Sequence, residues 1–228
     1  MHAEAPLGVV LHSVVVPIAW PVFDLRVTTP RLTLRLPVDV ELMRLAERAA
    51  GRVLSQERAG FMAGWTQIPS PEFERTFMAF HWRLRASWIP SDWHLDLGIY
   101  PVGEELPVGC IGALAREFAR TRSASTGSWL LPEWRGQGLG KEARAAILHL
   151  LFDGLEAVEA RSGAHPENAA SIAVSRGLGY RADGTERIVL GDGQAIEQVR
   201  LLLRRQEWTH RADITIDGLD GCRDMFGL

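Results

Sequence analysis

Apolar and polar positions along the chain follow two periods, which predict strands in some segments and helices in others. Alternation with a period of two, as in Leu32–Leu34–Leu36, predicts a half-buried strand, and apolar residues three and four apart predict helices. The predicted elements, in chain order, are a strand at 32–36, helices at 39–51 and from 70, strands at 93–100, 107–118 and 125–131, a helix at 138–153, a strand at 157–161, a helix at 168–176, and strands at 187–190 and 198–203. This mixture is typical of an α/β or α+β domain built on one central sheet.

Residues with capping preferences mark where several of these helices begin and end. Asp39 is predicted to be the N-cap of the first helix, and Gly51 is predicted to stop it. Ser70–Pro71–Glu72 predicts the start of the second helix, because proline suits a first turn and an acidic side chain favours the positive helix end. Gly154 is predicted to close the helix at 138–153.

The two outer segments of the chain differ from its middle. Residues 7–20 are largely apolar, but His12 and Pro17 interrupt them and no basic n-region precedes them, so they predict a strand or packed arm rather than a targeting signal. They are also too short to cross a bilayer. Near the other end, Ile214–Ile216 lies in another alternating run. We expect an N-terminal arm at 1–24, one main domain at 25–205, and a C-terminal tail at 206–228 with an extra strand.

Composition and charge limit the partners and the location of the protein. Hydrophobic residues make up 46% and charged residues 23%, as in an ordinary globular domain. The formal net charge of −3 gives no reason to expect a nucleic acid or an anionic membrane as a partner. The two cysteines, Cys110 and Cys222, have no metal-ligand spacing and form no disulfide framework, which fits a reducing compartment. The sequence therefore predicts a cytoplasmic protein that needs no metal.

The basic residues are divided unequally, and this division excludes several enzyme classes. Lysine and arginine together number 25, yet Lys141 is the only lysine. Pyridoxal-phosphate enzymes, P-loop NTPases and protein kinases each need a lysine in a fixed local context. Arg135 stands where the P-loop motif needs its first glycine, and Glu142 stands where it needs Ser or Thr. The sequence therefore lacks the lysine context that these three classes require.

A glycine-rich turn after the strand at 125–131 suggests a binding site for an anion. Residues 129–141 read Trp-Leu-Leu-Pro-Glu-Trp-Arg-Gly-Gln-Gly-Leu-Gly-Lys and run into a helix with an apolar stripe. Glycines let backbone N–H groups converge, and the helix start adds partial positive charge, so the turn suits a pyrophosphate. The dinucleotide fingerprint G-x-G-x-x-G does not fit, because Lys141 stands where glycine is required. A turn that binds no ligand is the alternative.

This turn and a second motif resemble the GNAT family of acyl-CoA-dependent N-acyltransferases. The coenzyme A loop of that family reads [Q/R]-x-x-G-x-[G/A], and Arg135, Gly138 and Gly140 match it. Downstream, Asn168 and a short predicted helix are followed by Leu178–Gly179–Tyr180, at the offset that the family shows. Further matches over 29–35 and 127–130 are similar to the RimJ/RimL-type branch. The tail resembles an actinobacterial group of that branch, some members of which use succinyl-CoA.

The resemblance implies a fold and a set of cofactor contacts. The fold would be an α/β (α+β) one, a GNAT-like twisted mixed β-sheet with helices on both faces, splayed between the fourth and fifth strands so that pantetheine enters there. Residues 25–205 would then form the acyltransferase domain. The implied coenzyme A contacts involve Leu130, Leu131, Arg135, Gly136, Gln137, Gly138, Leu139, Gly140, Lys141 and Asn168.

The chain matches the family less completely at the catalytic positions that the resemblance implies. Many relatives carry a tyrosine seven residues after the Asn, where this chain has Ser175, whereas the RimJ/RimL-type branch uses a serine three residues after it. Ser171 matches that serine and is expected to act as the acid that helps the thiolate leave. Many branch members also carry a glutamate where Ser125 stands here. The remaining candidates for the base are Asp96, Glu117 and Glu167.

The sequence assigns no catalytic role to two histidines, and it offers several arginines as possible contacts for the acyl group. Nothing in the sequence pairs His81 or His165 with an orienting partner, so both are predicted to be core or surface residues. A dicarboxylic acyl group such as succinyl would need a cation near its free carboxylate. The arginines available for that contact are Arg83, Arg85, Arg116, Arg120 and Arg122.

The sequence thus predicts an N-acyltransferase that moves an acetyl group from acetyl-CoA to a primary amine by direct attack. A succinyl-CoA-dependent enzyme of the same fold, and a CoA-binding sensor or interaction protein without catalysis, are the alternatives. The acceptor is open between small-molecule amines, protein N-termini and lysine side chains. The extra C-terminal strand also leaves a homodimer open.

Overall fold

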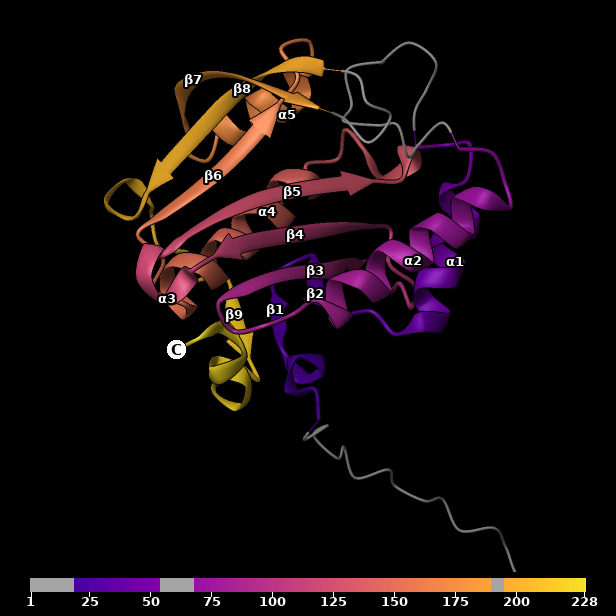
Figure 1. Cartoon of the computed structure of the whole chain (residues 1–228), viewed down its shortest axis with the longest axis horizontal. Coiled ribbons are helices and arrows are strands. Elements are labelled where there is room, and N and C mark those ends of the chain that lie inside the picture. Colours follow the sequence, from indigo (N-terminus) through magenta and orange to yellow (C-terminus); the bar gives the residue numbers. More distant parts are fainter. Residues whose placement is uncertain (1–18, 54–67, 190–194) are drawn as a thin grey trace, which may run out of the picture.

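One twisted sheet of nine strands forms the centre of the molecule (Figure 1). The computed structural model describes residues 19–53, 68–189 and 195–228. The strands are β1 Arg26–Thr28, β2 Leu32–Arg35, β3 Asp92–Pro101, β4 Gly109–Arg116, β5 Ser123–Leu130, β6 Glu159–Ala164, β7 Arg181–Val189, β8 Ala195–Arg204 and β9 Thr215–Asp217. Their order across the sheet is β7-β8-β6-β5-β4-β3-β2-β1-β9. Among these described strands, β5 and β6 pair in parallel and the other neighbours pair antiparallel.

Helices cover both faces of this sheet. Phe77 of α2 packs against Trp129 of β5, whereas Arg144 of α4 contacts the neighbouring Ser128. Successive side chains of a strand point to opposite faces, so α2 and α4 lie on opposite sides. The α-helices are α1 Asp39–Ala49, α2 Glu72–Ala86, α3 Phe118–Thr121, α4 Leu139–His149 and α5 Ala169–Arg176. The predicted GNAT-like sheet with helices on both faces is confirmed.

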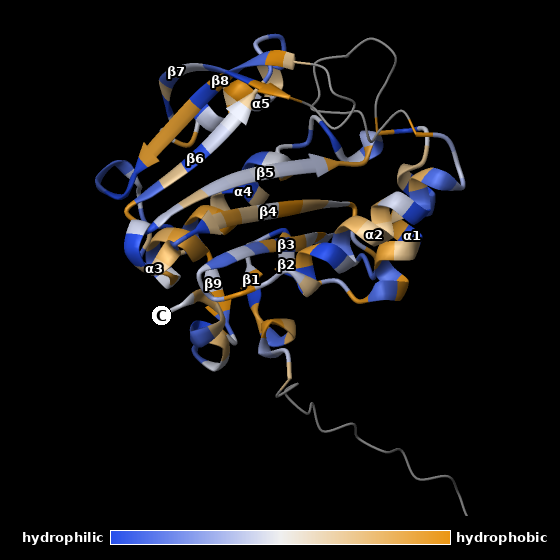
Figure 2. Ribbon diagram, in the orientation of Figure 1, coloured by the Kyte–Doolittle hydropathy of each residue, from blue (hydrophilic) through white to orange (hydrophobic). Residues whose placement is uncertain are grey.

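The alternation along β3 divides its side chains between the two faces. Leu95, Leu97 and Ile99 are fully buried and belong to the same core cluster as Ile147 of α4. Asp96, between the two leucines, points to the opposite face, where α2 lies. The core therefore sits mainly between the central strands and α4. Figure 2 shows β4 as largely apolar and the edge strand β7 as largely hydrophilic.

The sheet opens between β5 and β6. Their parallel pairing runs from Ser123 opposite Glu159 to Thr126 opposite Ser162, and it stops there although both strands continue. These are the fourth and fifth strands that the hydrophobic pattern predicts. The expected splay between them is therefore confirmed.

Several local expectations were wrong in detail. The N-cap of α1 is Val38 rather than Asp39, because the Glu41 carboxylate accepts the Val38 N–H at 2.9 Å. Asp39 is the first helical residue, and its carboxylate binds Arg85 at 2.6 Å. The predicted helix at 138–153 becomes π-helical at its end, over Leu150–Gly154. The short elements β1 and α3 have too few residues to show a period, so the pattern did not predict them.

The described ends of the chain meet at one edge of the sheet. β9, from the segment expected to add a strand, pairs antiparallel with β1. Behind it, Phe226 is fully buried, and the Trp88 indole N–H donates to the Met225 carbonyl at 2.8 Å. Of the expected N-terminal arm, residues 1–18 lie outside the described residues, while Val22 is buried in the core. No helix within the described ranges combines the length and the apolar character needed to cross a bilayer.

Candidate active site

The glycine-rich turn places backbone N–H groups at the start of α4. Gly136 and Gly138 have φ angles of +73° and +80°, and Gly138 is the N-cap of the helix. Within the described residues, no hydrogen bond uses the N–H groups of Gly136, Gln137 or Gly138. These donors lie at the positive end of a helix, which is the arrangement that binds phosphate groups. The turn therefore fits the pyrophosphate that the sequence predicts.

Not every N–H group of the predicted loop is available. The Arg135 N–H donates to the Pro132 carbonyl at 3.1 Å, and the Lys141 N–H donates to the Gly138 carbonyl at the same distance. The side chain of Arg135 bends back to the protein, where it donates to the carbonyls of Leu130 at 2.9 Å and Val53 at 2.6 Å. Arg135 thus holds the turn in place instead of presenting its own N–H.

A carboxylate fixes the first turn of α4 to the hairpin between β1 and β2. The Glu142 side chain accepts hydrogen bonds from the Thr29 hydroxyl at 2.7 Å and from the Arg31 N–H at 3.0 Å. Arg31 also donates from Nε to Glu142 at 2.7 Å and from Nη1 to the Gln137 carbonyl at 3.1 Å. The motif at 29–35 therefore fixes the candidate phosphate loop in position, and we call the contacts of Thr29 and Arg31 with Glu142 the clamp. Sequence reasoning missed Glu142 because its partner lies 111 residues away.

Loosening this clamp is expected to weaken CoA binding. Arg31→Ala and Glu142→Gln should each raise the Kd for CoA by about five- to tenfold, because a charge-assisted bidentate pair contributes on the order of 1 kcal/mol. The double variant should be little worse than either single one, since both remove one contact. Isothermal titration with CoA measures the effect. Arg44→Ala, which breaks an exposed ion pair on α1, is the matched control and should bind CoA normally.

Helix α5 brings the second motif beside the first. Asn168 is its N-cap, and the side-chain oxygen accepts the Ser171 N–H at 3.0 Å. The Ser171 side chain is half-buried, whereas Ser175 is fully buried and donates its hydroxyl to the Ser171 carbonyl at 3.0 Å. Lys141 reaches across from α4, with Nζ 3.1 Å from where a Cβ on Gly177 would lie. The contact between α4 and α5 thus unites the two predicted motifs.

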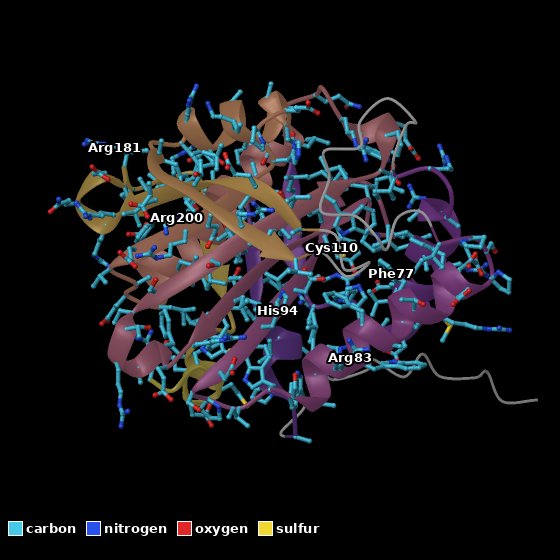
Figure 3. The ribbon with its side chains drawn as sticks, turned by 45° about the horizontal axis from the view of Figure 1, so that its top comes forward. Phe77, Arg83, His94, Cys110, Arg181 and Arg200 are labelled. Carbon is cyan, nitrogen blue, oxygen red and sulfur yellow. The ribbon has the colours of Figure 1, made fainter. Side chains whose placement is uncertain are left out.

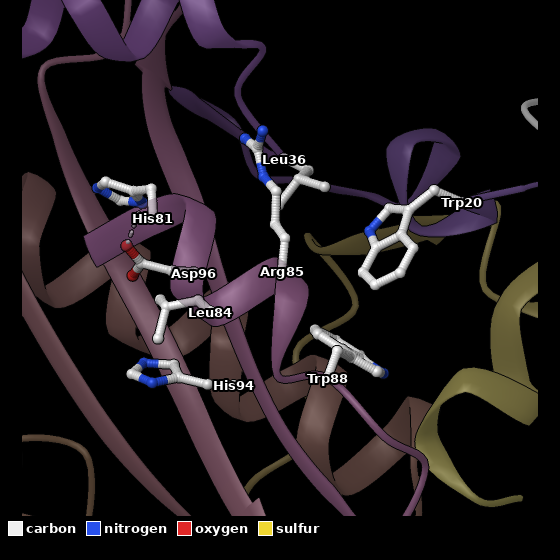
Figure 4. Close-up of a pocket in the computed structure, with 8 residues that line it drawn as sticks. All are labelled: Trp20, Leu36, His81, Leu84, Arg85, Trp88, His94 and Asp96. Carbon is white, nitrogen blue, oxygen red and sulfur yellow. Dashed lines mark ion pairs between the residues drawn. The ribbon is translucent and has the colours of Figure 1, made fainter. Parts of the chain in front are cut away.

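Asp96 lies on the other face of the sheet, in a nearly buried polar group (Figure 4). Its Oδ2 is 3.5 Å from Nδ1 of His81, and the Cys110 thiol donates a hydrogen bond to the same carboxylate. Burial raises the pKa of Asp96 to about 7, which the hydrogen bond from Cys110 opposes only in part. Burial also lowers the pKa of His81 to about 3, so that this histidine is neutral. Asp96 therefore changes charge in the range where a general base is useful.

The space in front of Asp96 is left open by two glycines. Asp96, Gly112 and Gly127 are paired in register on β3, β4 and β5. A Cβ on Gly112 would lie 2.9 Å from Asp96 Oδ1 and 3.1 Å from His94 Nε2, so both side chains lean over that glycine. A Cβ on Gly127 would meet no described atom within 4 Å. The carboxylate thus lies over β4, and β5 follows at one further strand spacing, about 5 Å beyond Gly112.

A small cavity adjoins this carboxylate. Its lining includes His81, His94 and Asp96, and its volume of about 10 Å³ is at the lower limit for holding one water molecule (Figure 4). Figure 3 shows His94 and Cys110 in the same region of the sheet, with Phe77 of α2 beside them. A water held there would be linked to the carboxylate. The site therefore suits a base that acts directly or through one water.

His81, Asp96 and Cys110 also deserve comparison with a metal site. One ligand atom from each lies within 4.8 Å of the others. Burial raises the pKa of the Cys110 thiol well above its usual value, so without a metal the thiol keeps its proton and donates it in a hydrogen bond to Asp96. The three side chains are better described as a hydrogen-bonded group. The sequence predicted His81 to be a core or surface residue without an orienting partner; the structure buries it and pairs it with Asp96.

The other candidate bases lie elsewhere. Glu117 follows the end of β4 that is remote from Gly109, whereas Gly109 pairs with Leu130 beside the loop, so more than about 20 Å of strand separates them. Glu117 is also exposed and lies 3.6 Å from Arg120. Glu167 is exposed and immediately precedes Asn168 at the start of α5. Asp96 is the only one of the three that is nearly buried, with 13% of its side chain exposed.

Comparison with known proteins assigns this arrangement to a described family. Residues 31–181 match the family model of the acetyltransferase (GNAT) domain, which covers most of the described sheet and both motifs. The match begins at Arg31 of the clamp and ends just after Tyr180.

Solved structures share the fold. A ribosomal-protein-S5-alanine acetyltransferase from Vibrio fischeri superposes with a TM-score of 0.59 at 13% identity, over 81% of this chain and 98% of that one. A GNAT-family acetyltransferase from Bacillus anthracis gives 0.62 at 16% identity, over 80% and 99%. A GCN5-related N-acetyltransferase from Brucella melitensis gives 0.61 at 17% identity, over 80% of each chain. At these identities the likeness concerns the fold alone.

Proposed function

Because this chain belongs to the GNAT acetyltransferase family, we propose that it transfers an acetyl group from acetyl-CoA to a primary amine. The observation that carries the proposal is a set of three N–H groups, at Gly136, Gln137 and Gly138, that have no acceptor among the described residues. They lie at the N-terminus of α4 and next to the opening between β5 and β6. This combination suits a phosphorylated donor whose arm enters the sheet.

In this proposal the donor is held by the predicted contacts that the fold leaves available. The N–H groups of the turn receive the pyrophosphate, with Leu139, Gly140 and the side chain of Lys141 beside it. Leu130 and Leu131, at the end of β5, lie along the path of the arm, although the Leu130 carbonyl already accepts from Arg135 and the Leu131 N–H donates to the Val108 carbonyl at 2.8 Å. Asn168 approaches from α5. All of these residues lie around the end of β5 or on the two helices that meet there.

Asp96 is the base in this proposal. A primary amine has a pKa of about 10 and must lose a proton before it attacks. A carboxylate with a pKa near 7 is about half ionised at pH 7 and is basic enough to accept that proton. Asp96 reaches the acceptor over Gly112 and Gly127, directly or through the adjoining water site. Glu117 is too remote from the loop to take this role.

Ser171 is proposed as the hydrogen-bond donor to the departing thiolate. It stands on the first turn of α5, and no hydrogen bond involves its hydroxyl within the described residues. Ser171→Ala should lower kcat by about ten- to a hundredfold, because a hydrogen bond to a charged group contributes about 1.5–3 kcal/mol. Ser87→Ala, at the end of α2, is the control and should keep full activity.

The donor and the acceptor are tested together by release of free thiol. The protein is incubated with acetyl-CoA or succinyl-CoA and a panel of small amines, peptide N-termini and lysine peptides. Turnover with acetyl-CoA supports the proposal, and faster turnover with succinyl-CoA would favour the dicarboxylic donor expected of the actinobacterial group. If the protein binds CoA tightly but shows no turnover with any combination of donor and acceptor, the alternative function, a non-catalytic CoA sensor, is favoured.

Three of the five arginines expected near a succinyl carboxylate already have partners, whereas Arg83 and Arg116 are exposed. Arg85 already binds Asp39, Arg120 pairs with Glu117, and Arg122 donates to the Leu155 carbonyl. Acetyl-CoA stays the proposed donor, in the RimJ/RimL-type branch. A cytoplasmic location, consistent with the two free buried cysteines, belongs to the same proposal. A homodimer stays a prediction of the sequence.

A further inference from the structure

A buried arginine lies where β5 and β6 separate. The side chain of Arg144 projects from α4 into the sheet and is only 4% exposed. Its Nη1 donates to the hydroxyls of Ser175 at 3.0 Å and Ser162 at 3.2 Å, and its Nη2 donates to the hydroxyl of Ser128 at 3.0 Å. These serines belong to α5, β6 and β5. The guanidinium thus links α4 to the two strands that separate and to α5.

This cation has no anionic partner in the part of the chain that the structure describes. No carboxylate lies within ion-pair distance of Arg144, and its Nε, also buried, has no hydrogen-bond partner. The other titratable group that faces it is Tyr180, whose hydroxyl shares a hydrogen bond with Thr126 and whose pKa burial raises. A buried charge without a counter-charge is strongly unfavourable. Such a group is expected where an anion arrives during function.

The three serines around Arg144 differ in where their own protons go. Ser162 donates to the Thr126 carbonyl at 3.2 Å, and Ser175 donates to the Ser171 carbonyl at 3.0 Å. For Ser128, no acceptor of its proton is present among the described residues. Ser128 also lies two residues beyond Thr126, where the pairing with β6 stops, and it is only half-buried. Ser128 is therefore the serine whose hydroxyl, polarised by Arg144, can donate a hydrogen bond to a ligand.

We propose that Ser128, held and polarised by Arg144, donates a second hydrogen bond to the sulfur of CoA, in addition to that of Ser171, as the acyl group leaves. This inference rests on the proposed acyl transfer. The amine nitrogen forms a bond to the thioester carbonyl carbon, and the carbon–sulfur bond breaks. The electron pair stays on sulfur, and the amine proton goes to Asp96. The products are the amide and the CoA thiolate, which afterwards takes a proton from water.

The positive charge of Arg144 behind the Ser128 hydroxyl stabilises a developing thiolate more than a neutral hydroxyl alone would. A hydroxyl alone gives one dipole to the developing charge, while a guanidinium in a water-poor site stabilises negative charge electrostatically. Ser175, which stands at the position of the tyrosine found in many relatives, cannot serve, because it is fully buried and its proton is engaged. Ser128 touches the sulfur in this proposal, and Arg144 is a positioning residue that acts through it.

The test is the acidity of the CoA thiol when bound to the full chain. Free CoA is titrated with and without excess protein, and the thiolate is followed by its ultraviolet absorbance as the difference from the separate components. In the wild-type protein the bound thiol should ionise at a lower pH than the free thiol, whose pKa is about 8.5 by analogy with cysteine. Ser128→Ala should move this ionisation back toward the free value by about one pH unit.

Matched variants separate this role from a structural one. Ser162→Ala also removes a hydrogen bond to Arg144, but its proton points to a carbonyl, so the bound thiol should ionise as in the wild type. Arg144→Met should abolish the shift, and it should lower kcat by about tenfold or more without raising the KM for acetyl-CoA. If Arg144→Met does not fold, Ser128→Ala still tests the proposal, since it leaves the cation and the core intact.

The outcomes distinguish this inference from the proposed function. Equal ionisation of bound CoA in the wild type and in Ser128→Ala would overturn the inference even if acyl transfer is observed. If the pKa of the bound thiol is lowered and depends on Ser128 but no turnover is observed, the proposed contact between Ser128 and sulfur is supported and the proposed acyltransferase activity is rejected. Equal shifts in the Ser128 and Ser162 variants would show that only the packing around Arg144 matters, and would also reject the proposal.

Discussion

Asp96→Asn is expected to lower kcat by about a hundredfold or more while the Kd for CoA stays unchanged. Removal of a general base typically costs a factor of 10² to 10⁴. The amide keeps the shape of the carboxylate and its place over Gly112, so the loss reports the proton acceptor and not a change in packing. Steady-state rates with saturating acetyl-CoA, and CoA titration of the same samples, measure the two quantities. Asp92→Asn, an exposed carboxylate on the same strand, is the control and should retain wild-type rates.

The pH dependence supplies an independent check of the same residue. Because the base must be ionised, the wild-type rate should rise with pH through the pKa of Asp96, about 7. The stability should change in the opposite direction. Between pH 3.8 and about 7 the folded protein holds a proton that the unfolded chain has lost, so the free energy of unfolding falls as pH rises through this window. Asp96→Asn should lack this decline. Wild-type rates at every pH in the variant would place the base elsewhere, with Glu167 next to be tested.

Gly138→Val is expected to raise the Kd for CoA by at least about tenfold. The φ angle of Gly138 is +80°, in a region that a β-branched residue avoids, and such strain costs about 1–3 kcal/mol. The nearest described atom to a Cβ there is Nη2 of Arg31 at 3.4 Å, so the protein itself leaves room for the side chain. The rise in Kd therefore arises because the backbone N–H groups are reoriented and because the valine side chain occupies space that the pyrophosphate needs. A tenfold rise in Kd corresponds to about 1.4 kcal/mol of binding free energy.

A second strained glycine provides the matched control for this variant. Gly184 has a φ of +87° and lies in β7, at the far edge of the sheet. Gly184→Val should lower the melting temperature in a similar way but bind CoA normally. If both variants bind CoA like the wild type, the phosphate loop has been assigned to the wrong turn.

The arrangement of strands and helices was largely predictable because the side chains that build it repeat locally. Leu95, Leu97 and Ile99 alternate with polar or small residues, and this period alone is enough to identify a strand with one buried face. The loop at 129–141 was recognisable for the same reason, since its glycines and the helix start are neighbours in sequence. Asn168 and Ser171 likewise lie within one helical turn.

The parts of the site that the sequence did not predict depend on register and on distant contacts. Asp96 gains its importance from facing Gly112 and Gly127, and only the pairing of three strands brings these residues into line. Arg144 stands in the same helix as the exposed Lys141, and arginine is normally a surface residue. Its burial follows from three serines on three separate elements. None of these relations leaves a local period in the sequence.

The single lysine gives the protein an unusual response to chemical labelling. Lys141 is exposed and stands in the first turn of α4, with its Nζ above the end of α5. An amine-directed reagent therefore has one side chain to modify, and that side chain borders the candidate phosphate loop. The extent of labelling would report directly whether the loop is occupied. A protein proposed to carry reactive thioesters also offers them only one lysine of its own to acylate.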